Sequence, residues 1–201
     1  MTHEAARLLA ERLQPLYEQR IVTVLSGLVK TATQEKEGKT IRFPVSFDTV
    51  TQPVEMKDAD LVPDSRQRGI LYFEGDDATV TRSEPNYTRY SANLRMVFWY
   101  NAKRYQLNGD HPESIHTALM AAVLHYLNKG PKVPTLLQAF QFEITRVVQD
   151  NLFSKYTYRE EKSQFLLSPY YAFGIDLTAT FQLNHNPICH DSLVIVDVND
   201  C

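Results

Sequence analysis

The stretch YAFGIDLTATFQLN, residues 171–184, alternates between apolar and polar side chains along its whole length. One parity carries the apolar side chains Tyr171, Phe173, Ile175, Leu177, Ala179, Phe181 and Leu183. The other parity carries Gly174, Asp176, Thr178, Thr180 and Gln182. Alternation with a period of two predicts a β-strand with one buried face. At about 3.3 Å per residue this strand would reach roughly 45 Å, about twice the usual length.

A second long strand and several shorter ones are predicted by the same pattern. RYSANLRMVFWY, residues 89–100, places alternate apolar side chains on one face. Shorter strands are predicted at 21–29, 41–47 and 140–149. The charged stretch QEKEGK, residues 34–39, is predicted to form the long tip of a hairpin whose second strand lies at an edge because it contains Pro44. Residues 69–82 are predicted to form another hairpin that turns at Gly75, Asp76 and Asp77.

Two helices are predicted. The first begins at Thr2 as a capping residue and is interrupted by Pro15, with a buried stripe of Ala5, Leu9, Leu13 and Leu16. The second spans 112–128 and is preceded by Asp110, with Glu113 completing a capping box. Its predicted buried stripe is Ile115, Leu119, Ala122, Val123 and Tyr126. Because few helices separate the strands, we expect an α+β fold with an antiparallel sheet, packed by this central helix and the N-terminal helix.

The chain of 201 residues is expected to form one domain, 1–201. This domain would carry a protruding hairpin at about 30–40, a long loop or arm at 48–68 and a C-terminal extension at 185–201. Scattered Lys and Arg with a net charge of −3 do not fit a duplex-binding surface. Without an apolar run of the ~18 residues that a membrane span needs, and without a signal-like N-terminus, we expect a soluble protein made in the cytoplasm.

Two groups of side chains are of types that bind metals or take part in chemistry. His185, Cys189, His190 and Cys201 are of the types that bind zinc, although their spacing matches no common ligand pattern, so metal binding there stays open. The acids Asp58, Asp60, Asp64, Glu74, Asp76 and Asp77 suggest a magnesium-dependent nuclease as an alternative, although acids are also common in loops and turns. No glycine-rich phosphate loop or nucleophile elbow is present, so no cofactor and no catalytic residue is predicted.

Tyrosine and arginine alternate with other residues in the connection before the last strand, a mixture that protein interfaces favour. The charged hairpin tip and the arm are also expected to reach other proteins. The predicted contact residues are Glu35, Lys36, Glu37, Lys39, Asp58, Asp60, Arg66, Arg68, Tyr156, Tyr158 and Arg159.

Four stretches of the sequence together resemble the tail terminator and head-to-tail joining proteins of tailed bacteriophages. They are YSANLRMVFWY (90–100), the helix 112–128, FEITRVVQDNLFSKYTY (142–158) and SPYYAFGIDLTATFQLN (168–184). The ending SKYTY…SPYYAFGIDLTATFQL looks like the neck ring proteins of crAss-like phages. The arm 48–68 and the extension beyond residue 184 exceed a minimal tail terminator.

The resemblance implies a structural virion protein and no enzyme. Copies would form a homo-oligomeric ring at the head-to-tail joint of the virion, between neighbouring neck, portal and tail proteins and without a membrane. Genomic DNA would pass through the lumen without specific binding, and the lumen-facing residues would be Asp176, Thr178, Thr180 and Gln182. Two alternatives stay open: a small metal-dependent nuclease or other soluble enzyme, and an adaptor that binds a peptide along an open sheet edge.

Overall fold

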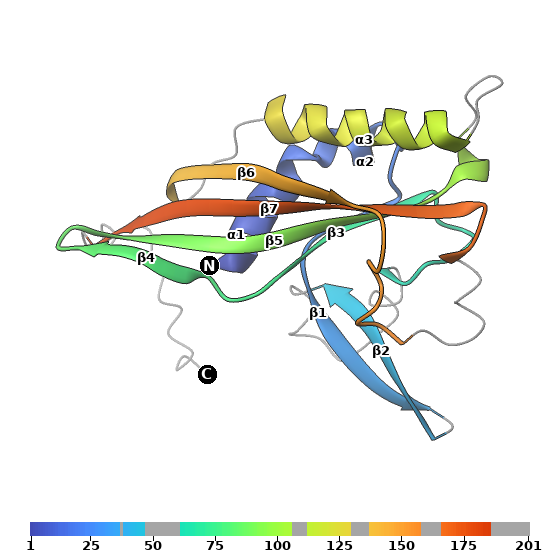
Figure 1. The fold of residues 1–201 in the computed structure, drawn as a ribbon, viewed down its shortest axis with the longest axis horizontal. Coiled ribbons are helices and arrows are strands. Elements are labelled where there is room, and N and C mark those ends of the chain that lie inside the picture. The colour runs from blue at the N-terminus through green and yellow to red at the C-terminus, as the bar shows by residue number, and fades with distance from the viewer. Residues whose placement is uncertain (37, 47–60, 106–111, 130–136, 158–165, 186–201) are drawn as a thin grey trace, which may run out of the picture.

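The computed structural model describes residues 1–36, 38–46, 61–105, 112–129, 137–157 and 166–185 (Figure 1). Its elements, in chain order, are α1 (Thr2–Arg12), α2 (Gln14–Glu18), β1 (Val24–Lys36), β2 (Lys39–Ser46), β3 (Gly69–Gly75), β4 (Thr79–Glu84), β5 (Tyr87–Asn101), the 3₁₀ turn η3 (Ala102–Arg104), α3 (Pro112–Lys129), β6 (Gln138–Val148) and β7 (Tyr170–Asn184). The mixed α+β class is therefore confirmed. None of the described helices is both long and apolar enough to cross a membrane.

All seven strands belong to one sheet, in the order β2-β1-β3-β5-β7-β6, with β4 also paired to β5. The expectation of a purely antiparallel sheet is wrong at one position, because β1 and β3 pair in parallel. A parallel pair needs a long connection that returns the chain to the end where it started. Here β2 and the residues up to Arg68 separate β1 from β3, which leaves enough chain for that return.

The two long predicted strands are confirmed. β5 and β7 each contain 15 residues. They pair antiparallel along their whole length, from Tyr87 opposite Asn184 to Asn101 opposite Tyr170. Figure 1 shows them running the length of the sheet. Together they form the framework on which the other elements are placed.

The predicted hairpin over residues 69–82 is wrong. β3 pairs with Leu94–Tyr100 of β5, whereas β4 pairs with the opposite half of β5, Tyr87–Ser91. The two strands therefore lie end to end along the same edge of β5. Since β3 already has β1 on its other side, it offers no free edge to β4.

The helices cover one face of the sheet. The predicted stripe of α1 and α2 is confirmed, since Ala5, Leu9, Leu13 and Leu16 are fully buried. Helix α1 ends at Arg12, and Pro15 lies in the first turn of α2. Thr2 does not cap α1, because its hydroxyl donates to the carbonyl oxygen of Asp76 at 2.9 Å.

Helix α3 runs along the long strands on this same side (Figure 1). It buries Ile115, Leu119, Val123 and Leu127 in the main core, at a spacing of four residues that keeps them on one face. The sequence pattern missed Leu127, while the predicted Ala122 and Tyr126 are only half-buried. The predicted capping residue Asp110 lies outside the described residues.

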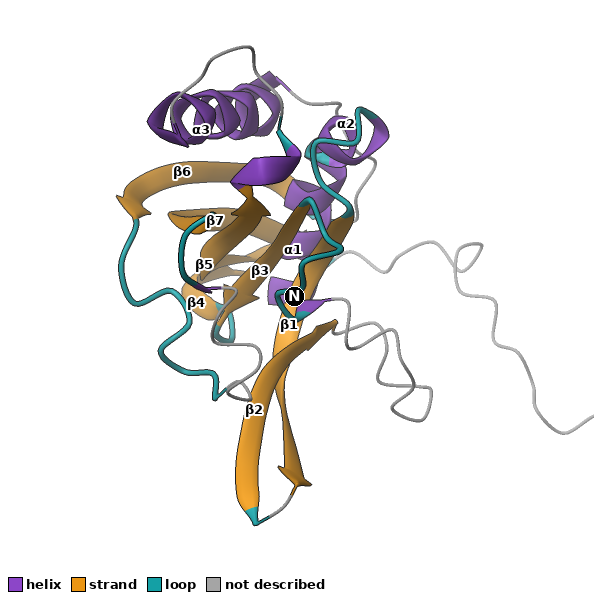
Figure 2. Ribbon diagram, turned by 90° about the vertical axis from the view of Figure 1, so that its right-hand side faces the viewer, coloured by secondary structure: helices purple, strands orange, loops and turns teal. Residues whose placement is uncertain are grey.

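The hairpin β1–β2 projects away from the helices (Figure 2). Its two strands stay paired up to Lys36 opposite Lys39, so the expectation of a long six-residue tip is wrong. Gly38 has a φ of 73°, a conformation that tight hairpin turns require and glycine adopts readily. The edge position of β2 is confirmed. The outer edge of β2 is braced at one point, where Arg42 exchanges two backbone hydrogen bonds with Thr157 at 3.3 and 3.0 Å.

A second apolar layer covers part of the opposite face of the sheet, where the sequence predicted polar exposure. Its buried members, which we call the second layer, are Val29, Leu61, Ile70, Tyr72, Val97, Trp99 and Tyr156. Strand β3 is consequently buried on both faces. Tyr156 is only 6% exposed, so it does not form the surface contact predicted for it. Its hydroxyl group is hydrogen-bonded within the same chain, as described below.

The C-terminal part of the predicted arm belongs to the body of the protein. Leu61 and Pro63 are buried, and Leu61 lies in the second layer. Asp64 pairs with Arg66 at 3.0 Å. The predicted contact residues Asp58 and Asp60 lie outside the described residues.

Candidate functional site

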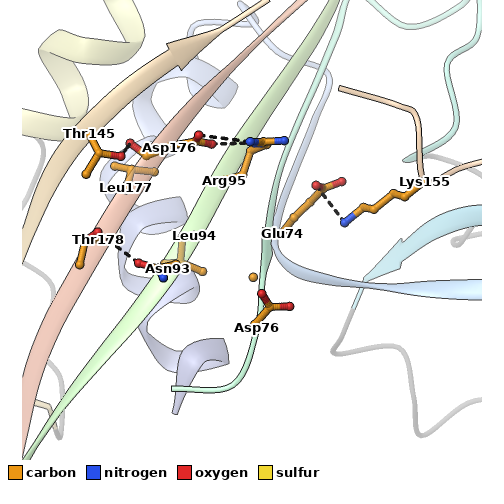
Figure 3. A pocket seen from close by; sticks show the side chains of 11 residues that line it. Glu74, Asp76, Asn93, Leu94, Arg95, Thr145, Lys155, Asp176, Leu177 and Thr178 are labelled. Carbon is orange, nitrogen blue, oxygen red and sulfur yellow. Dashed lines mark hydrogen bonds and ion pairs between the residues drawn. The ribbon is translucent and has the colours of Figure 1, made fainter. Parts of the chain in front are cut away.

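Beyond the second layer, the same face of the sheet is polar. We call this region the polar face; it is formed by Arg89, Ser91, Asn93 and Arg95 of β5 and by Asp176, Thr178, Thr180 and Gln182 of β7. The structure therefore brings together on one face all four residues predicted to face a lumen. Figure 3 shows the end of this face that borders the second layer.

Charged side chains form a row across four strands at this border. The register places Glu74 of β3 opposite Arg95 of β5, Arg95 opposite Asp176 of β7, and Asp176 opposite Arg146 of β6. Lys155 extends the row beyond Glu74. The signs alternate along the row, so three cations face two carboxylates and leave a net charge of about +1. We refer to these five residues as the charged row.

Asp176 is the centre of the row. Its Oδ1 accepts a hydrogen bond from Arg95 Nε at 2.6 Å, and its Oδ2 accepts one from Arg146 Nη2 at 2.8 Å. The hydrogen bond from Arg95 is the main reason that the pKa of Asp176 lies below its usual value of 3.8, against the opposing effect of burial. The same bond raises the pKa of Arg95. Both shifts favour the ionised forms of Asp176 and Arg95.

Glu74 links the charged row to the second layer. Its side chain is almost fully buried, and a buried carboxylate is costly unless it is paired. Lys155 Nζ lies 2.9 Å from Oε2, and the Tyr156 hydroxyl donates to Oε1 at 2.5 Å. Both carboxylate oxygens are thus occupied, and the connection that follows β6 is fastened to β3.

Apart from Arg89, which is exposed, the rest of the polar face carries uncharged side chains. Thr178 donates to Asn93 Oδ1 at 3.2 Å, and Gln182 donates to Asn184 Oδ1 at 3.0 Å. Thr180 lies opposite Ser91. A shallow, open hollow of about 360 Å³ extends from Glu74 to Thr178. This surface offers many hydrogen-bonding groups and few uncompensated charges, which suits weak and reversible contact with water or a polar polymer.

The predicted partner-contact residues fall in separate places. Glu35 and Lys39 are exposed on the projecting hairpin. Arg66 and Arg68 lie near the start of β3 instead, and Arg68 donates to the carbonyl oxygen of Arg20 at 2.9 Å. Outside the described residues lie Glu37, Tyr158 and Arg159, and the Lys36 side chain is also not described.

His185, the described member of the suggested zinc group, uses both ring nitrogens within the protein. Nε2 lies 2.8 Å from the Thr88 hydroxyl, and Nδ1 lies 3.1 Å from the carbonyl oxygen of Pro85. Because a carbonyl oxygen only accepts, Nδ1 carries the proton and Nε2 accepts from Thr88. Cys189, His190 and Cys201 lie outside the described residues. Within the described residues, no three or more His, Cys, Asp or Glu side chains are grouped to hold a metal ion.

No protein-family model and no curated protein matches the chain.

We expect Asp176→Asn to lower the free energy of unfolding by about 1–3 kcal/mol, because it leaves two guanidinium groups facing one another without a carboxylate. Urea denaturation near pH 7 measures this change. The matched control is Thr180→Ala on the same strand and face, which we expect to change stability by less than about 0.5 kcal/mol. Equal stability of Asp176→Asn and the wild type would show that the pairing contributes nothing.

His116 of α3 is a half-buried titratable group between helix and sheet. Its Nδ1 lies 3.0 Å from the Tyr100 hydroxyl, and its ring contacts Phe173 edge to face, with centroids 5.2 Å apart. It lines an open hollow of about 720 Å³ together with Gln149 and Tyr171. Burial lowers the pKa of His116 below its usual 6.5.

This lowered pKa predicts a stability that depends on pH. The unfolded chain takes up a proton at His116 near pH 6.5, whereas the folded chain does so only at lower pH, so stability falls as the pH drops from 6.5 toward the folded pKa. We expect His116→Gln to reduce this loss in thermal unfolding experiments between pH 8 and 5. His125→Gln, at an exposed position on the same helix, is the control. An unchanged pH profile in His116→Gln would contradict the assignment.

Proposed function

We propose that this chain is a structural subunit of the head-to-tail joint of a tailed bacteriophage, where its copies form a ring that DNA passes through. The observation that carries the proposal is the polar face along β5 and β7, which no described helix covers, whereas α1 and α3 cover the opposite face. Strands of 15 residues are far longer than the usual five or six. Strands of this length exceed what the core of one small protein requires. In a ring they would line the inner wall.

The charge pattern of the polar face supports a lumen role. Protein affinity for DNA comes mainly from Lys and Arg that neutralise phosphates. Here Asp176 already pairs with Arg95 and Arg146, and the neighbouring Thr178 and Thr180 are uncharged. Among the described residues, Arg89 is the one arginine of the polar face without a carboxylate partner. Such a surface lets a duplex pass without holding it.

Contacts between copies are supported by the edges of the sheet. Within the described residues, no strand pairs with the outer edges of β4 and β6, and open edges favour association with another chain. Each of these strands also exposes a large apolar side chain, Val80 on β4 at 59% and Val147 on β6 at 40%. The projecting hairpin β1–β2 adds a charged arm that extends beyond the sheet (Figure 2).

The direct test is the mass of the purified full chain over a range of concentrations, combined with electron microscopy of the same samples. We expect closed rings of uniform size. A protein that stays monomeric at all concentrations and nicks DNA only with a divalent metal would overturn the proposal in favour of a nuclease.

Lysine substitutions at the two edges locate the contacts. We expect Val80→Lys and Val147→Lys each to reduce the ring fraction at least tenfold, because a charge at an edge strand opposes pairing with another chain. Leu167→Lys is the matched control, since Leu167 is 68% exposed and lies outside the strands. Rings that persist in both edge variants would show that copies do not meet through β4 and β6.

The open edge of β6 also supports a second candidate function, an adaptor that takes up an extended peptide as an added strand. The same measurements separate the two. A monomer that binds a peptide and loses it on Val147→Lys is expected of an adaptor, whereas self-association without a peptide is expected of a ring subunit.

A further inference from the structure

Five cationic side chains gather at the end of the sheet where β3 starts and β5 ends. We call them the basic patch: Arg20, Arg66, Arg68, Lys103 and Arg104. The described carboxylates beside them are Glu18 and Asp64, so the patch carries a local excess of about three positive charges. The whole chain has a net charge of −3, which makes this concentration of positive charge unusual within the molecule.

Two guanidinium groups in the patch are held in place without being neutralised. Arg68 Nη1 donates to the carbonyl oxygen of Arg20 at 2.9 Å, and its guanidinium lies 5.5 Å from the centre of the Tyr105 ring. Arg104 donates from Nε and Nη2 to the carbonyl oxygen of Ser65 at 3.2 and 3.0 Å. Because these acceptors are uncharged carbonyls, they do not neutralise either guanidinium group, and several N–H groups of each have no acceptor among the described residues. In the part of the chain that the structure describes, no carboxylate pairs with either group.

Two hollows open between these side chains, and both are lined by Arg68 and Arg104. The larger, of about 960 Å³, also has apolar walls from Ile21, Leu119 and Ala122. The smaller measures about 530 Å³. A basic rim above an apolar floor fits a peptide that combines acidic residues with a short apolar run.

Residues 186–201 of this chain have that composition. They contain Asp191, Asp197 and Asp200, no Lys or Arg, and the apolar run LVIV at 193–196. Their three negative charges match the excess on the patch. We propose that residues 186–201 of one copy bind the basic patch of a neighbouring copy. This inference deepens the proposed ring and rests on it for the presence of that neighbour.

The position of the patch favours a neighbouring copy over the same subunit. β7 ends at Asn184, which pairs with Tyr87, whereas the patch lies beyond the other end of β5, next to Asn101. Along 15 residues of strand the two ends are separated by about 46 Å. Sixteen residues reach at most about 58 Å when fully extended. Binding within one subunit would therefore require the segment to be largely extended, whereas a neighbour can present its patch close to Asn184.

A labelled peptide of residues 186–201 tests the binding directly. It is titrated by fluorescence anisotropy into the full chain whose own segment is neutralised by Asp191→Asn, Asp197→Asn and Asp200→Asn. We expect saturable binding that weakens at least tenfold on Arg68→Glu with Arg104→Glu, and similarly in high salt. Arg82→Glu with Arg89→Glu, the same charge change at the opposite end of β5, is the matched control and should leave the affinity unchanged. If the double variant unfolds, Arg104→Glu alone, at an exposed position, is expected to give a smaller loss of affinity.

A mixing experiment shows whether the contact joins two copies. Neither the neutralised-segment variant nor the Arg68→Glu, Arg104→Glu variant is expected to associate alone, whereas an equal mixture should give heterodimers by mass, because each pair retains one intact contact. The control for the first variant is Asp77→Asn, Glu113→Gln and Asp150→Asn, which removes as many carboxylates at exposed positions elsewhere and should still associate.

The outcomes separate this inference from the ring. A wild type that is monomeric, together with a peptide that binds only the neutralised-segment variant, would mean that the segment occupies its own subunit. Peptide binding that is unchanged by Arg68→Glu with Arg104→Glu would also overturn the inference. So would a short DNA duplex that binds the basic patch more tightly than the peptide does. Rings that form with a neutralised segment would retain the proposed function and reject this contact.

Discussion

Trp99→Ala is expected to lower the free energy of unfolding by about 3–5 kcal/mol, the usual cost of removing a large aromatic side chain from a core. Trp99 is 1% exposed and stacks on Tyr170, with ring centroids 5.5 Å apart. It lies in the second layer, on the face that the alternation of the sequence predicts to be polar. The loss of unfolding free energy therefore tests whether the second layer excludes water from this face of the sheet near β3.

Unfolding of this variant is followed by circular dichroism in urea, since Trp99 is the only tryptophan of the chain. Tyr17→Ala removes an aromatic side chain that is 48% exposed and serves as the control. We expect the control to change stability by about 0.5 kcal/mol or less. A loss as small as this in Trp99→Ala would mean that the second layer does not form.

Phe173→Ala is expected to have a similar cost of about 3–5 kcal/mol, for a reason on the other face. Phe173 is fully buried, and its ring packs edge to face against Phe98 of β5 at 5.2 Å and against His116 of α3, also at 5.2 Å. Removing it leaves a cavity between the helix and the two long strands. Protection of α3 amides from hydrogen exchange is expected to fall together with global stability.

The control for Phe173→Ala is Leu167→Ala, three residues before β7 begins and largely exposed. Its stability should equal that of the wild type within about 0.5 kcal/mol. If α3 exchange is unchanged in Phe173→Ala while the strands are destabilised, the helix is held to the sheet by other contacts.

The elements with a long regular pattern were predictable from the sequence. The strict alternation in 171–184 and 90–100 predicts β7 and β5, and the capping box and apolar spacing over 112–128 predict α3 within a residue or two. In each case the pattern repeats over several helical turns or several residue pairs of a strand. The local sequence therefore determines the type of secondary structure.

The second layer was not predictable in this way. Val97 and Trp99 lie on the parity of β5 that also carries Arg95, so alternation alone gives all three the same environment. Trp99 is buried because Leu61 and Tyr156, from distant parts of the chain, pack in the same cluster at this end of the sheet. The parallel pairing of β1 with β3 was missed for the same reason, since it depends on a connection without a regular pattern.

The candidate site was half predictable. Parity alone places Asp176, Thr178, Thr180 and Gln182 on one face, as the structure shows. The pairing of Asp176 with Arg95 and Arg146 depends on the register of three strands, which the sequence does not reveal. The basic patch combines residues from 20, 66–68 and 103–104, whose proximity follows only from the sheet order.

The brace between Arg42 and Thr157 has a mechanical consequence. Thr157 follows Tyr156, whose hydroxyl is bonded to Glu74 in the middle of the sheet. A force that bends the hairpin is therefore transmitted through two adjacent residues to β3 instead of being absorbed at the hairpin base. In the proposed ring, tension that a neighbouring copy applies at the hairpin would be borne by the whole sheet.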